Sequence, residues 1–158
     1  MLGISLSVKD MKKNNFGTTI YRSVILVLMT ILLMACATHP TQTLYSQIGG
    51  QVGVEKITDA FIDEIQYDQH TLSFFLETDI DRFREKFIEH LCVHLGGPCT
   101  YTGDDMLSVH KGMNIKEADF NRVVELLTNA MTKVNIPHRI QNQILAKFAP
   151  MRKDIVYR

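Results

Sequence analysis

Hydrophobic residues recur at helical spacing along most of the chain. Between residues 52 and 67 they fall at every third or fourth position with acidic residues on the other side, which is typical of a helix with one buried face. The same spacing returns over residues 80–95, 117–134 and 137–151. No stretch alternates as a half-buried strand does. The pattern predicts an all-α domain of about 115 residues with four substantial helices and two short ones.

Glycine, proline and aspartate residues mark the ends of these helices. Gly96-Gly97-Pro98 is predicted to end the helix over residues 80–95, because glycine accepts the left-handed cap and proline cannot continue the hydrogen-bond ladder. Asp79 or Asp81 is predicted to cap the start of that helix. Pro137 is expected to open the last helix and Pro150 to kink it near its end.

The composition is that of a folded globular protein. Of the 158 residues, 46% are hydrophobic, and 17 basic residues balance 17 acidic ones. Without the first 35 residues the chain carries 13 basic and 16 acidic residues. A nucleic-acid partner is therefore not expected, since such proteins carry a basic excess.

The amino terminus has the pattern of an export signal. Basic residues precede an apolar run over Val24–Ala35, which is too short for a comfortable membrane span but suits the core of a signal peptide. The run ends in Leu33-Met34-Ala35-Cys36, which resembles a bacterial lipobox. The predicted organisation is a signal peptide over residues 1–35, a lipidated Cys36, a tether over residues 36–43 and a folded domain over residues 44–158.

An uncleaved signal anchor is the alternative interpretation of this segment. Met11 is a second candidate for the first residue, because Met11-Lys12-Lys13 is a more typical opening for a signal peptide. Both versions place the domain outside the cytoplasmic membrane, since positive charge before the apolar run holds the amino terminus inside. We therefore expect an exported protein at the periplasmic face of a bacterial membrane, with a lipid anchor as its membrane contact.

The two remaining cysteines, Cys92 and Cys99, have two interpretations. In an oxidising compartment they could form a disulfide between the end of a helix and the loop that follows. They could equally be buried thiols that pack as small apolar side chains, because six intervening residues fix neither distance nor direction.

His110 is the strongest candidate for chemistry. It ends a predicted short turn over residues 106–110, between two longer helices. A histidine in that position can direct one ring nitrogen into a flat apolar cavity and bind iron as a neutral imidazole. Taken alone, a histidine of this kind is more often a surface residue, so the interpretation depends on the motifs around it.

Those motifs resemble the group I truncated haemoglobins. They are Leu44-Tyr45-Ser46-Gln47-Ile48-Gly49-Gly50, Leu72-Ser73-Phe74-Phe75, Leu95-Gly96-Gly97-Pro98, Tyr101-Thr102-Gly103, Met106 with His110, and Ile136-Pro137. They follow in order from Leu44 to Val156 without large gaps. The resemblance implies a truncated globin fold, a two-on-two helical sandwich around a haem (iron protoporphyrin IX).

The resemblance also implies which residues contact the haem. His110 matches the proximal histidine, the metal ligand whose Nε2 coordinates iron, and Phe75 matches the phenylalanine that wedges against the porphyrin. Lys86 is expected to reach a propionate or solvent, with iron ligation as a minor alternative. The other residues expected at the haem are Phe74, Thr78, Phe83, Phe87, Tyr101, Met106 and Val109.

The predicted distal pocket departs from the family pattern. The family typically has a tyrosine directly after a phenylalanine in the second helix, and a polar residue in the next helix, to hydrogen-bond the bound ligand. Here Ile62 follows Phe61, and the later positions are Phe83 and Phe87. His90 shares their helical face by its spacing, so it could donate to a ligand, bind iron as a sixth ligand, or lie at the pocket rim bonded to water.

These features favour a haem protein that reversibly binds oxygen, nitric oxide or carbon monoxide, as in oxygen transport. A hydrogen bond to a charged acceptor is worth about 1.5–3 kcal/mol, so the lack of donors argues against tight oxygen storage. One alternative is an enzyme, a nitric oxide dioxygenase or a peroxidase, with a reductase as partner. Another is a gas or redox sensor with an internal iron ligand.

Overall fold

The computed structural model describes residues 21–29 and 42–158. The chain divides into two compact units, Met1–Pro40 and Thr41–Arg158. In the first unit, the described residues 21–29 are helical. No helix within the described ranges is long and apolar enough to cross a membrane. The predicted lipobox, Cys36 and most of the predicted tether lie outside the described residues.

The second unit is built from helices. They are α2 (Leu44–Gln47), α3 (Gly50–Tyr67), α4 (Gln69–Leu72), α5 (Ile80–His94), α6 (Met106–His110), α7 (Glu117–Lys133), α8 (His138–Phe148), the 3-10 helix η1 (Ala149–Met151) and α9 (Arg152–Ile155). No strand occurs over residues 42–158. The all-α prediction is confirmed, and the four substantial helices are α3, α5, α7 and α8.

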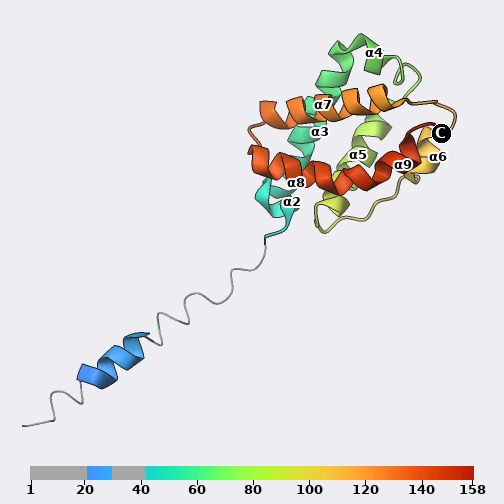
Figure 1. Ribbon diagram of the computed structural model, residues 1–158. Coiled ribbons are helices and arrows are strands. Elements are labelled where there is room, and N and C mark those ends of the chain that lie inside the picture. The colour runs from blue at the N-terminus through green and yellow to red at the C-terminus, as the bar shows by residue number, and fades with distance from the viewer. Residues whose placement is uncertain (1–20, 30–41) are drawn as a thin grey trace, which may run out of the picture. The chain divides into compact units, whose positions relative to one another are not determined.

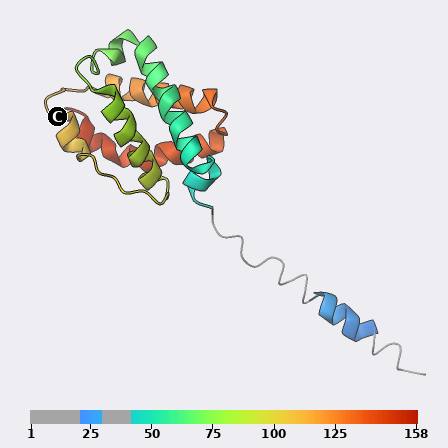
Figure 2. The same cartoon turned by 180° about the vertical axis from the view of Figure 1, so that it is seen from behind.

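The four long helices form a two-on-two sandwich. Figure 1 shows α7 and α8 in front of α3 and α5, and Figure 2 shows α3 and α5 from the other side. Helix α3 contacts both α5 and α7, so it joins the two layers. The short helix α6 lies at one end of the sandwich and contacts α9 (Figure 1).

The apolar stripe of each helix faces the core. The residues buried there include Val54, Ile57, Phe61 and Ile65 of α3, Leu91 of α5, Leu126, Leu127, Ala130 and Met131 of α7, and Ile140 and Ile144 of α8. Their spacing of three or four residues is the periodicity seen in the sequence. Full burial of one such side chain contributes about 1.5–3 kcal/mol, so these stripes hold the layers together.

Both ends of α5 are fixed by the residues predicted to fix them. Asp79 caps the start, with Oδ1 accepting the Arg82 N–H at 3.0 Å, which decides between Asp79 and Asp81. At the other end Gly96 adopts a φ of +79°, and the Gly97 N–H donates to the Cys92 carbonyl at 2.8 Å. This is a Schellman cap, and it turns the chain into the segment that leads to α6.

Candidate functional site

Helix α6 carries His110 at its carboxyl end. The helix has five residues, too few to be stable alone, since isolated helices shorter than about 12 residues are marginal in water. Asp105 caps it: its carboxylate accepts the Ser108 N–H and the Ser108 hydroxyl, each at 2.9 Å. The Ser108 N–H holds the pKa of Asp105 below its ordinary value. The cap and the contact with α9 therefore fix the turn that presents His110.

The ring of His110 is held in a single tautomer. Its Nδ1 lies 2.8 Å from the carbonyl oxygen of Met106, one turn earlier in α6. Because a carbonyl can only accept, Nδ1 carries the proton and Nε2 carries the lone pair. Burial lowers the pKa of His110, against the opposing effect of the Met106 carbonyl. His110 is thus a neutral imidazole with Nε2 as the free ligand atom, and this donor fits haem iron.

Four phenylalanine rings form a continuous row across α3, α5 and the segment between α4 and α5. Phe61 lies 5.1 Å from Phe87 between ring centroids, Phe87 stacks on Phe83 at 5.5 Å, and Phe83 meets the edge of Phe75 at 5.1 Å. Phe61 is buried, whereas the other three rings are half-buried against the core. Ile62, beside Phe61, is also half-buried. These five side chains contain no hydrogen-bond donor, so the row is an apolar surface.

His90 lies among other rings near the carboxyl end of α5. Its ring contacts His94 at 4.3 Å, Tyr101 at 5.2 Å and Phe148 of α8 at 5.5 Å, rather than Phe83 or Phe87. The reason is that the segment after α5 folds back along the helix and brings Tyr101 against His90. The sharing of a helical face with Phe83 and Phe87, and a role for His90 toward a ligand, stay predictions.

The imidazole of His90 is also unusual in its surroundings. It is 7% exposed, and its Nδ1 is buried without a hydrogen-bond partner. Burial, followed by the nearby charges of His94 and His110, lowers the pKa of His90 to about 4. His90 is therefore neutral at pH 7.

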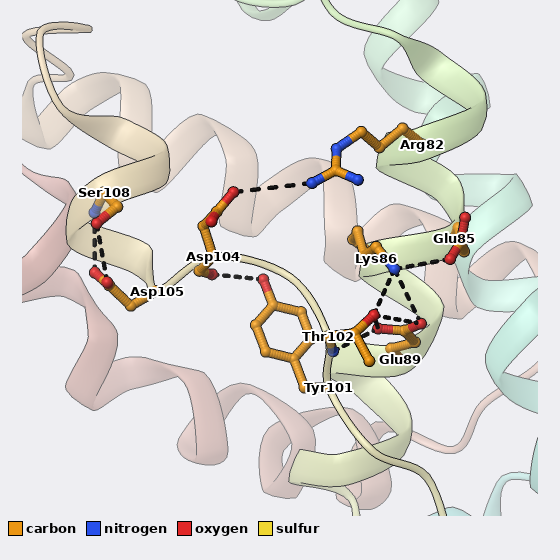
Figure 3. Close-up of polar contacts among 9 residues, drawn as sticks. All are labelled: Arg82, Glu85, Lys86, Glu89, Tyr101, Thr102, Asp104, Asp105 and Ser108. Carbon is orange, nitrogen blue, oxygen red and sulfur yellow. Dashed lines mark hydrogen bonds and ion pairs between the residues drawn. The ribbon is translucent and has the colours of Figure 1, made fainter.

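Lys86 is part of a polar cluster on α5 (Figure 3). Its Nζ donates to Thr102 Oγ1 at 2.6 Å, to Glu85 at 2.7 Å and to Glu89 at 3.2 Å. Glu89 in turn accepts the Thr102 N–H at 2.8 Å, which is the largest cause of its lowered pKa. Hydrogen bonding to Glu85, with Glu89, raises the pKa of Lys86, so the lysine is held as a cation among these partners. A contact between Lys86 and a haem propionate stays a prediction.

The remaining predicted haem residues lie in the segment between α4 and α5 and in α6. Phe74 meets the ring of His70 edge-on at 5.9 Å, Thr78 is exposed, and Met106 is half-buried. Val109 on α6 is 47% exposed. Contacts of these four residues with haem stay predictions.

The structure decides between the two interpretations of the cysteines. Cys92 and Cys99 are joined by a disulfide, with 5.9 Å between their Cα atoms. Cys92 is fully buried at the carboxyl end of α5 and Cys99 is half-buried in the following segment. The covalent bond therefore ties that segment to the helix.

Several contacts near the site had no sequence prediction. His70 pairs with Asp119 of α7 at 2.6 Å, and Asp119 also accepts the Lys116 N–H. The residues are 49 positions apart, so no local pattern signals the pair. Asp105 could have been found, because an aspartate three residues before a serine at the start of an apolar turn is a capping pattern. Within the described residues, no cluster of three or more His, Cys, Asp or Glu side chains could hold a metal ion.

Comparison with known proteins gives the family. The family model described as bacterial-like globin matches residues 43–157. The chain belongs to the bacterial-like globins. It is 32% identical over 113 residues to a group 1 truncated hemoglobin of Mycolicibacterium paratuberculosis, covering 72% of this chain and 83% of that protein. A group 1 truncated hemoglobin of Tetrahymena pyriformis is 28% identical over 115 residues, covering 73% and 95%.

Solved structures agree with this assignment. The crystal structure of the Fe(III) form of truncated hemoglobin from Tetrahymena pyriformis superposes on this globin with a TM-score of 0.72 at 27% identity, covering 74% of this chain and 100% of that chain. The predicted group I truncated globin fold is thus confirmed. Haem is the cofactor of this globin, and the free Nε2 of His110 together with the apolar phenylalanine row fits a flat apolar ring around an iron ion.

Proposed function

We propose that this truncated globin binds nitric oxide or carbon monoxide more readily than oxygen, at haem iron held by His110. The observation that carries the proposal is the row Phe61, Phe87, Phe83 and Phe75 with Ile62 beside it. Haem supplies a ferrous iron with one coordination position for a diatomic ligand. The chain supplies the neutral imidazole on one side, and a surface without hydrogen-bond donors on α3 and α5.

The apolar surface separates ligands by their polarity. Oxygen binding to ferrous iron places negative charge on the ligand, and hydrogen-bond donors stabilise that charge. Carbon monoxide and nitric oxide depend less on such donors. A missing hydrogen bond to a charged acceptor is worth about 1.5–3 kcal/mol, or roughly ten- to more than a hundredfold in affinity. Hence the preference of this globin shifts away from oxygen.

The test is the ratio of carbon monoxide to oxygen affinity in the wild type and in Phe87→Gln. Glutamine adds an amide donor at the centre of the row, so we expect the ratio to fall at least tenfold through tighter oxygen binding. Phe87→Leu is the matched control, since it alters the ring without adding a donor, and it should leave oxygen affinity within a few-fold of wild type. An unchanged ratio in Phe87→Gln would refute the proposed ligand preference.

We further propose that the globin is exported and anchored by lipid at Cys36. The support is the run from Val24 to Ala35 with basic residues before it and Cys36 directly after it. A lipid chain at Cys36 would hold the domain at a membrane surface through residues 36–43. When the chain is expressed in a bacterium with labelled palmitate, the wild type should incorporate label and Cys36→Ala should not. Equal labelling of both proteins would exclude this site.

A further inference from the structure

We propose that the segment Gly96–Asp105 is a latch that positions His110, and that the Cys92–Cys99 disulfide makes the latch sensitive to reduction. The inference rests on the proposed role of His110 as the iron ligand. It assigns a function to contacts that lie outside the phenylalanine row: the disulfide and the polar cluster of Lys86, Glu89 and Thr102.

The segment runs back along α5 and is attached to it at successive points. Cys99 is bonded to Cys92, the Tyr101 ring packs on His90, and Thr102 is held by Glu89 and Lys86. Figure 3 shows the last attachments, where Thr102 faces Glu89 and Lys86 and the Asp104 carboxylate points toward Arg82 at 3.9 Å. The residue number rises along the segment as it falls along α5, so the two run antiparallel with matched contacts.

The attachment to Glu89 differs from an ordinary surface ion pair. Glu89 and Lys86 side chains are 21% and 17% exposed, and Glu89 accepts both the N–H and the hydroxyl of Thr102. The carboxylate thus fixes the backbone of the segment as well as a side chain. Charge-assisted hydrogen bonds with restricted solvent access are stronger than exposed pairs, so this point holds the segment in one register.

The latch ends where α6 begins. The Tyr101 hydroxyl donates to the Asp104 carbonyl at 2.7 Å, and Asp105 then caps α6 through Ser108. Helix α6 follows Asp105 directly, and His110 is the last of its five residues. Because that helix is too short to be stable alone, the place of the His110 ring depends on where the latch holds Asp105, together with the contact between α6 and α9.

Reduction would break the Cys92–Cys99 disulfide, which is the covalent attachment of the latch to α5. One thiolate of a dithiol reductant attacks the half-buried Cys99 sulfur, which breaks the bond to Cys92, releases the Cys92 thiolate and forms a mixed disulfide with Cys99. The second thiolate of the reductant then attacks the reductant's own sulfur in that mixed disulfide and releases the Cys99 thiolate. The products are two cysteine thiols in the protein and one oxidised dithiol, so the protein gains two electrons and two protons. The segment is then held by noncovalent contacts with α5, those of Tyr101, Thr102 and Asp104 among them, and α6 gains freedom. In an exported globin, the disulfide would make haem retention depend on the thiol redox state of the compartment.

The experiment compares haem-loaded protein before and after treatment with a dithiol. We expect backbone amide exchange over residues 99–110 to accelerate tenfold or more, and haem transfer to excess apomyoglobin to accelerate several-fold. The double variant Cys92→Ala/Cys99→Ala should show both changes without reductant and no response to it. The iron–histidine stretching band of the ferrous protein should broaden in the same samples, which a loss of stability elsewhere would not cause.

Matched variants of Thr102 test the polar attachment of the segment to Glu89 and Lys86. Thr102→Val removes the hydroxyl and should accelerate amide exchange over residues 106–110, whereas Thr102→Ser keeps the hydroxyl and should behave as the wild type. Asp59→Asn breaks the Arg84 pair on the α3 side of α5, and should leave exchange in this region unchanged. The latch is overturned if reduction and Thr102→Val both leave exchange and haem transfer at wild-type rates. Retention of haem by His110→Gly would instead overturn the ligand assignment, and the exchange data would still judge the latch.

Discussion

At the scale of single residues, His90 and His110 show how the surroundings give two histidines different hydrogen bonding. The Nδ1 of His110 donates to a carbonyl and leaves Nε2 free, whereas the Nδ1 of His90 is buried without a partner. A buried polar atom without a hydrogen bond costs about 1–3 kcal/mol. A phenyl ring would fill the place of His90 among Tyr101, His94 and Phe148 without that cost.

The first prediction concerns His90→Phe. We expect the variant to be more stable than the wild type by about 1 kcal/mol at pH 7, because it removes the unpaired nitrogen and keeps the ring contacts. The measurement is urea unfolding at equilibrium. A loss of stability would mean that the His90 nitrogen has a partner in solution, such as a ligand of the haem site.

The same variant should change the dependence of stability on pH. The pKa of His90 is about 4 in the folded protein and near 6.5 when unfolded, so between these values the unfolded state binds more protons. Wild-type stability is therefore full above pH 6.5 and is lost as the pH falls toward 4, by up to about 3 kcal/mol from this residue. His90→Phe should show a shallower decline. Burial also lowers the pKa values of His94 and His110, so these two residues contribute to the pH dependence of stability that remains in the variant.

The second prediction concerns Ile62, next to Phe61 on α3. Ile62→Tyr places a phenol donor beside the phenylalanine row, and should slow oxygen dissociation at least tenfold. Ile62→Phe has nearly the same bulk without the hydroxyl, and should not slow it. Flash photolysis of the ferrous protein in mixtures of oxygen and carbon monoxide gives both rates. Equal oxygen dissociation in the two variants would contradict the role of the missing donor.

His110 and the phenylalanines could be singled out from the sequence because their positions belong to motifs within short stretches of chain. The surroundings of His90 could not be found in this way. Its spacing predicts on which face of α5 it lies, but its neighbours Tyr101 and Phe148 come from the segment after α5 and from α8. Helical spacing alone carries no information on such contacts.

At the scale of elements, α6 depends on its cap more than the longer helices do. Asp105 satisfies a backbone N–H and the Ser108 hydroxyl at the start of a helix of five residues. Helices α3, α5, α7 and α8 bury long stripes and are less sensitive to one end.

The third prediction therefore concerns Asp105→Ala. Loss of the cap should destabilise the protein by about 1 kcal/mol and raise the rate of haem transfer to apomyoglobin several-fold. Asp79→Ala removes the equivalent cap of α5, and serves as control. Since α5 is anchored along its length, Asp79→Ala should cost similar stability with little effect on haem transfer. Equal haem transfer in the two variants would show that α6 does not depend on its cap.

Periodicity predicted where the long helices lie, and glycine and proline predicted where several of them end. Gly96 and Gly97 form the expected cap, and Pro150 lies in η1, where the regular helix α8 has stopped. The disulfide and the latch contacts could not be predicted from periodicity or from the positions of glycine and proline. They depend on the path of a loop with no periodic pattern.

At the scale of the whole molecule, the four long helices form a two-layered sandwich that α6 joins at one end (Figures 1 and 2). The stripes define which face of each helix is buried, but not which helix covers it. The contact between α3 and α7, far apart in the chain, followed from the resemblance to truncated haemoglobins and not from periodicity. Family membership then gives haem as the cofactor, and the tautomer of His110 leaves Nε2 as the ligand atom that we propose.

The most direct test is haem binding by His110→Gly, followed by absorption in the Soret region during titration with haem. We predict loss of the wild-type Soret band and of haem retention, with the band restored by added imidazole, which replaces the missing ring at the iron. His138→Gly, which removes an exposed histidine, should bind haem as the wild type does. Wild-type Soret absorbance and haem retention in His110→Gly would contradict the account.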